Sequence, residues 1–151
     1  MMLMKVIYML AVHELEEIYI GDLTHLQIDK KEKVKIGHEA VSKVLGELAV
    51  KDKITNIINE FDERKTNEAL FAHYCDKLEC DIQSKLYDLE GCVDLNKQEN
   101  NTTYNNDKVQ KFLQEGKSWS DMWLLYGQER YNYDENFLKI SNYVLNNNID
   151  L

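Results

Sequence analysis

Apolar residues recur with helical spacing along most of the chain. Between residues 3 and 20, an i, i+3, i+4, i+7 pattern is formed by Val6, Met9, Leu10 and His13. Residues three and four apart share one face of an α-helix, so this pattern predicts a single helix over 3–20. We interpret the apolar start of the chain as the front half of that helix, buried in the protein.

The same spacing predicts a series of further helices. Their expected ranges are 30–48, 50–65, 66–90, 107–115, 118–131 and 135–146. In the first of these, the expected apolar face consists of Val34, Val41, Leu45 and Leu48. Thr66 is a suitable N-cap for the long helix that follows it. No strand pattern exceeds four residues, so the predicted fold class is all-α, a multi-helix bundle of six or seven helices.

Two polar stretches predict loops between these helices. Gly21 opens the first, which covers 21–29. The second, over 95–106, is rich in asparagine and predicts a mobile surface loop. Too little chain follows it to fold alone, so we expect one domain over 1–151.

Composition narrows the range of functions. Charged residues make up 30% of the 151 residues and the net charge is −9, so binding to a nucleic-acid polymer is not expected. The apolar start "MMLMKVIYMLAV" is too short to span a bilayer and carries no cleavage motif, so no membrane association is expected. The three cysteines are an odd number and no secretory signal precedes them, so we expect a reducing cytoplasm.

The stretch "VHELEEIYIGD", residues 12–22, carries the candidate chemistry. On a helix, His13 and Glu17 are i, i+4 neighbours, and Glu14 and Glu17 are i, i+3 neighbours. Imidazole nitrogen and carboxylate oxygen suit Mn, Fe, Co or Zn. A solvated acidic helix face is the alternative reading. The zinc-peptidase pattern H-E-x-x-H is incomplete, because its second histidine is replaced by Glu17.

Together with "ERKTNEALFAHYCDKLECDIQ" downstream, this stretch resembles the HD-domain phosphohydrolases, in the branch with bacterial 5'-deoxynucleotidases and their eukaryotic relatives. That family has a helical His-Asp pair, a Glu three positions after that Asp, then Gly-Asp. An Asp in a "DKLE"-type helix follows far downstream. The resemblance runs from about Lys5 to Gly91. It implies an HD-like helical fold. Relatives of this family are commonly dimeric, which leaves a homodimer open for this chain.

The resemblance also implies a metal centre. His13 matches the metal histidine of the family, Glu14 stands at the position of its metal aspartate, and Asp76 in "CDKLE" matches the distal metal carboxylate. The implied cofactor is a divalent ion, namely Mn, Co, Fe, Zn or Mg. His73 lies three residues before Asp76 and could be a further ligand or a partly buried polar residue.

The remaining matches concern catalysis and substrate. Glu17 matches the acidic residue that activates the attacking water, and Asp22 matches the aspartate near the sugar of the substrate. Lys33 matches a charged residue of the next helix that is structural or faces the substrate phosphate. The resemblance favours an enzyme over a non-catalytic protein. The implied activity is metal-dependent hydrolysis of a nucleoside monophosphate or similar small phosphate monoester.

Two departures from the family pattern keep another function open. The pair is His-Glu, and the additional methylene of Glu14 moves its carboxylate by about 1 Å or more. The family has another metal histidine on an earlier helix, whereas none of the twelve residues before His13 is a histidine. We therefore expect either a longer protein whose N-terminal helix is missing here, or a catalytically degenerate HD-like module that binds or assembles.

The stretch "SWSDMWLLY" adds an aromatic stripe at helical spacing. Its members are Trp119, Met122, Trp123 and Tyr126. Such a stripe is usually part of a core, and we expect that here. The alternative is a dimer face.

Overall fold

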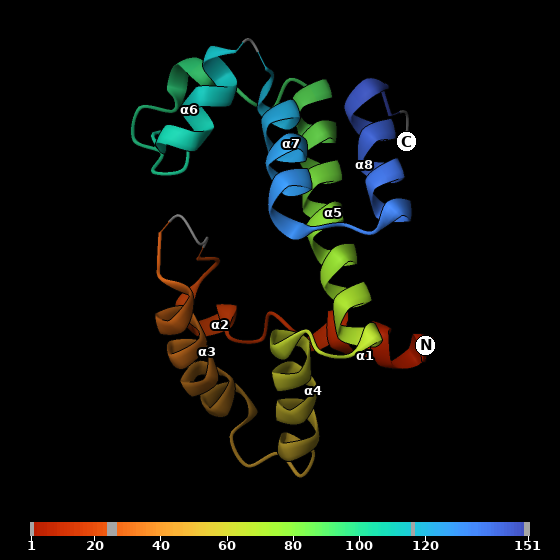
Figure 1. Ribbon diagram of the computed structural model, residues 1–151. Helices are drawn as coiled ribbons and strands as arrows, with labels where there is room; N and C mark the ends of the chain where they lie inside the picture. Colours follow the sequence, from red (N-terminus) through yellow and green to blue (C-terminus); the bar gives the residue numbers. More distant parts are fainter. Residues whose placement is uncertain (1, 24–26, 116, 150–151) are drawn as a thin grey trace. The chain divides into compact units, whose positions relative to one another are not determined.

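The computed structural model describes residues 2–23, 27–115 and 117–149, and within them every regular element is a helix (Figure 1). The predicted all-α fold class is confirmed. The chain divides into two compact units, Met1–His73 and Tyr74–Leu151. The expectation of one domain remains a prediction. None of the described helices combines the length and the apolar character needed to cross a membrane.

Among its described residues, the first unit contains four complete helices and the start of a fifth. They are α1 (Leu3–Val12), α2 (Glu17–Ile20), α3 (Lys30–Leu45), α4 (Lys51–Glu63) and α5 (Asn67–Leu89). Helix α5 continues into the second unit. There it is followed by the 3-10 helix η1 (Leu95–Lys97), α6 (Asp107–Gln114), α7 (Trp119–Tyr131) and α8 (Glu135–Asn146).

The predicted single helix over 3–20 is wrong, because α1 ends at Val12 and a turn over 13–16 separates it from α2. In this turn the amide of Leu15 donates to the carbonyl of Val12, a three-residue spacing in place of four. Nδ1 of His13 lies 2.9 Å from the carbonyl oxygen of Leu10, which the next helical turn would otherwise have used. A side chain thus replaces the backbone donor at the point where the helix ends.

Two apolar clusters form the core of the first unit. One joins α1 to α4 and to the first turns of α5, through Val6, Met9, Phe61, Ala69 and Ala72. The other joins α3 to α4, through Val41, Leu45, Ile54 and Ile58. The predicted apolar face of α3 is therefore only half right, since Val34 is 37% exposed and Leu48 is 56% exposed.

Several helices of this protein start at a side-chain cap. Oγ1 of Thr66 accepts from the amide of Ala69, as predicted for the start of α5. Ser118 forms a capping box with Asp121 at the start of α7. Asp134 accepts from two amides at the start of α8. The helices of the second unit therefore begin where local sequence specifies.

Helix α7 contributes most to the core of the second unit. Met122, Leu124 and Tyr126 are buried, and Phe137 and Val144 of α8 are buried as well. Trp119 and Trp123 are half-buried. The aromatic stripe thus belongs mainly to the core, as expected. The 95–106 stretch, predicted as a loop, contains η1 and a series of turns in which Asn101 and Asn105 bond to nearby backbone groups.

Candidate functional site

His13 is held in one orientation at the end of α1. Its Nδ1 lies 2.9 Å from the carbonyl oxygen of Leu10, which fixes the hydrogen on Nδ1 and leaves the lone pair on Nε2. The imidazole also packs against the ring of Phe61, with 4.7 Å between the ring centroids. Histidines that bind metals usually donate their other ring N–H to a carbonyl or carboxylate in this way. The local structure of His13 therefore fits a metal ligand.

Glu14 stands next to Nε2 of His13. Its Oε1 lies 3.6 Å from Nε2 of His13, and its side chain is 58% exposed. With the hydrogen of His13 on Nδ1, facing the Leu10 carbonyl, Nε2 of His13 and Oε1 of Glu14 are both hydrogen-bond acceptors. A cation or a proton between these two atoms would therefore be favourable. The chemistry of the pair, one imidazole nitrogen and one carboxylate oxygen, matches the preference of divalent first-row metals. The structure thus places these two predicted ligands side by side.

Glu17, the predicted base, begins α2 and is half-buried. Burial raises the pKa of Glu17, and the nearby charges of Glu14 and Asp22 raise it further. The positive charge of Lys33 lowers it, but the net direction is upward. A carboxylate with a raised pKa accepts a proton more readily near neutral pH. The environment of Glu17 is therefore compatible with general-base chemistry.

Glu16 is a candidate that the sequence analysis missed. It is half-buried, and its Oε2 has no hydrogen-bond partner among the described residues. Burial raises the pKa of Glu16, and the charge of Asp62 adds to that direction. Glu16 lies three residues after His13, so the same helical spacing that selected Glu17 could have selected it. Its burial could not be foreseen from the run of acidic residues.

Lys33 and Asp22 have different surroundings. Nζ of Lys33 donates to the carbonyl oxygen of Leu23, 2.7 Å away, and the lysine is half-buried. Asp22 is exposed in the loop that follows Gly21. Lys33 therefore ties the start of this loop to α3. Its predicted contact with a substrate phosphate remains a prediction, as does the role of Asp22.

Asp76 lies on α5 in the second unit, where it is 9% exposed. Its Oδ2 lies 2.8 Å from Nζ of Lys77. Burial lowers the pKa of Lys77, but the charge and hydrogen bond of Asp76 outweigh it, so the pKa rises. His73, one helical turn earlier in the first unit, is 3% exposed and packs edge-on to Phe61. Its alternative roles, ligand or buried polar residue, both remain open.

The family model of the HD domain matches residues 1–119, and the chain belongs to this family. The prediction made from the motifs is therefore confirmed. A Dictyostelium discoideum protein named 5'-deoxynucleotidase HDDC2 is 36% identical to the chain over 88 residues. This match covers 56% of the chain and 46% of the relative, so it spans less than half of that protein. No solved structure matches the chain significantly.

Proposed function

We propose that the protein is a metal-dependent phosphohydrolase that acts on a small phosphate monoester, of the nucleoside monophosphate class. The observation that carries the proposal is the His13–Glu14 pair at the end of α1, in a chain of the HD-domain family. The name of the Dictyostelium relative supports the nucleotide class of substrate.

The proposed metal ligands are His13, Glu14 and Asp76. They would offer one imidazole nitrogen and two carboxylates, a donor set that suits Mn, Fe, Co or Zn. When bound, a divalent ion supplies positive charge that lowers the pKa of water and offsets charge on a phosphoryl oxygen.

Glu17 is the proposed proton acceptor. One of its carboxylate oxygens would take the proton from the attacking water, and its raised pKa brings it nearer to the range in which such a transfer is efficient. Lys33 and Asp22 are the proposed substrate-binding residues. Because Lys33 already donates to Leu23, we expect it to act partly by positioning this loop. For Lys33 to contact a phosphate, its hydrogen bond to the carbonyl of Leu23 would have to be replaced by one to a phosphate oxygen.

The test separates metal binding from proton transfer. Asp76→Asn should lower the bound Mn or Co, measured by plasma mass spectrometry. Glu17→Gln should keep the metal and lower phosphate release from a deoxynucleoside monophosphate by about a hundredfold or more. Glu47→Gln, at an exposed position after α3, is the matched control and should change neither quantity. Circular dichroism checks the Asp76 variant, which also removes the partner of Lys77.

Each assignment can fail separately. Full metal occupancy in Asp76→Asn would remove Asp76 from the ligand set, and unchanged turnover in Glu17→Gln would move the base to another residue. Glu14→Asp should strengthen metal binding if Glu14 is a ligand displaced by one methylene.

The second candidate function is a catalytically silent HD-like module that binds or assembles. The observation in its favour is that Glu14 replaces the aspartate of the family and is 58% exposed. A silent module predicts no turnover, and a Glu14→Asp variant that neither binds metal nor gains activity.

A further inference from the structure

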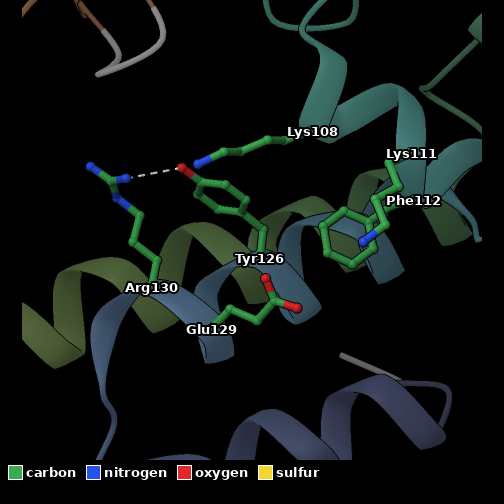
Figure 2. Close-up of a pocket in the computed structure, with 6 residues that line it drawn as sticks. All are labelled: Lys108, Lys111, Phe112, Tyr126, Glu129 and Arg130. Atoms are coloured by element: carbon green, nitrogen blue, oxygen red, sulfur yellow. Dashed lines mark hydrogen bonds between the residues drawn. The ribbon is translucent and has the colours of Figure 1, made fainter.

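A pocket between α6 and α7 gathers positive charge on an otherwise acidic protein (Figure 2). Its volume is about 340 Å³, near the lower end of the range for small-molecule sites. The chain as a whole carries a net charge of −9. The pocket, in contrast, is lined by three cations, two aromatic rings and one carboxylate: Lys108, Lys111, Arg130, Phe112, Tyr126 and Glu129.

Two of the cations converge on one hydroxyl group. Tyr126 is 5% exposed, and its hydroxyl oxygen accepts from Nη1 of Arg130 at 3.1 Å. The guanidinium of Arg130 also lies 5.8 Å from the centroid of the Tyr126 ring. Figure 2 shows the ammonium group of Lys108 extending from α6 toward the same hydroxyl. Two donors on different helices are therefore directed at one point at the mouth of the pocket.

The described part of the chain does not balance this charge. No described carboxylate forms an ion pair with Lys108, Lys111 or Arg130, and Glu129 lines the pocket without pairing with any of them. Cations held near one another repel, and an anion between them would replace that repulsion with charge-assisted hydrogen bonds. A phosphate or phosphonate group offers the acceptor oxygens that a guanidinium and an ammonium bind best.

The aromatic side chains define the rest of the ligand. Phe112 is half-buried in the pocket wall, on the same helix as Lys108 and four residues after it. A planar group carried by the anion can stack against such a ring. A long polyanion is disfavoured, because it would meet the remaining negative charge of the protein.

We propose that this pocket binds a small phosphate or phosphonate that carries an aromatic ring. The anion lies between Lys108 and Arg130 at the Tyr126 hydroxyl, and the ring lies against Phe112. None of the lining residues belongs to the candidate metal centre, so the site is a second, non-catalytic one. It does not depend on the proposed phosphohydrolase activity.

The test uses phenylphosphonate, which has no ester bond to hydrolyse, and inorganic phosphate as the ring-free probe. Binding to the full chain is measured by isothermal titration calorimetry with EDTA present, so that no metal contributes. Tryptophan fluorescence gives a second readout, because the Trp123 ring lies 6.0 Å from the Tyr126 ring. Wild type should bind phenylphosphonate more tightly than phosphate.

Three variants assign the binding. Lys108→Gln combined with Arg130→Gln should weaken phenylphosphonate binding about tenfold or more. Phe112→Leu should weaken phenylphosphonate but leave phosphate binding unchanged. Lys139→Gln removes one exposed charge from α8, where the lysine pairs with Glu135, and should leave both affinities unchanged. Both cations replaced in the double variant are exposed, so its circular dichroism should match wild type.

Absence of phenylphosphonate binding by wild type at millimolar concentrations would overturn the proposal. Equal affinity of wild type and the double variant would overturn it too. An equal loss in Lys139→Gln and in the double variant would show attraction by overall charge, and so would also reject a defined site. Equal loss of both probes in Phe112→Leu would reject the stacking arrangement.

Discussion

Asp81 lies in the core of the second unit, and its ionisation should contribute to the pH dependence of stability. The residue is 4% exposed, and its Oδ2 accepts from the hydroxyl of Tyr133 at 3.2 Å. The carboxyl group occupies space next to Gly127 of α7, where an added Cβ would lie 3.2 Å from Cγ of Asp81. Helix α5 thus places an acid where α7 leaves room for it.

Burial raises the pKa of Asp81 to about 7, against the hydrogen bond from Tyr133 and the charge of Lys77, which both lower it. The ordinary value is 3.8. The difference between these two pKa values corresponds to about 4 kcal/mol in the free energy of unfolding, between the protonated and the ionised form of Asp81. Since the folded state holds this proton more tightly than the unfolded state, the contribution of Asp81 to stability is fully present below about pH 3.8. It falls as the pH rises toward about 7 and levels off above that value.

The other ionisable groups that face Asp81 do not change the direction. Lys77 on α5, Tyr131 on α7 and Tyr133 in the following loop all have pKa values raised above their ordinary ranges. They therefore keep their protons throughout the window in which Asp81 titrates. The difference in pH dependence between wild type and an Asp81 variant can therefore be assigned to this carboxyl group.

Asp81→Asn keeps the shape and removes the titration. We expect urea unfolding to show wild type losing roughly 2.5 kcal/mol of stability relative to the variant between pH 5 and pH 8, because the steepest change runs over about two pH units, from pH 5 to about 7. Asp94→Asn is the control. Hydrogen bonds from Lys97 and from the amide of Asn96 lower the pKa of Asp94, so its carboxyl group is ionised at both pH 5 and pH 8. The reasoning fails if the free-energy difference between wild type and Asp81→Asn is the same at pH 5 and pH 8.

Three further changes test the packing by urea unfolding. Gly127→Ala should cost about 1–3 kcal/mol despite the better helix propensity of alanine, because its Cβ overlaps Asp81; a stabilised variant would contradict this. Met9→Ala should cost about 2–5 kcal/mol, since Met9 is fully buried; a loss below about 1 kcal/mol would place it outside the core. Ser118→Ala should cost about 0.5–2 kcal/mol, because Oγ of Ser118 accepts from the amide of Asp121. An unchanged unfolding midpoint would mean that this cap contributes nothing.

Local patterns in the sequence determined the helical class, most of the helix boundaries and the family. The last helix was predicted over 135–146 and is observed at Glu135–Asn146. The cap at Thr66 was predicted and is present. The motifs around His13 and Asp76 indicated the HD-domain family, which the match over residues 1–119 confirms. The helix boundaries and the cap follow from residues a few positions apart, since helical spacing and capping are local properties.

Tertiary structure decided which of those local possibilities are used. Helical spacing continues past Val12, but α1 ends there, where the His13 ring packs against Phe61 of α4 and its Nδ1 lies beside the carbonyl of Leu10. Helical spacing also cannot say which apolar residues meet a neighbouring helix. The exposure of Val34 could therefore not be predicted from the spacing of α3. The burial of Asp81 beside Gly127 depends on α5 and α7 packing together, across forty-six positions of sequence. A pattern read along one helix carries no information about the helix opposite it, and that partner sets burial, pKa and the shape of a pocket.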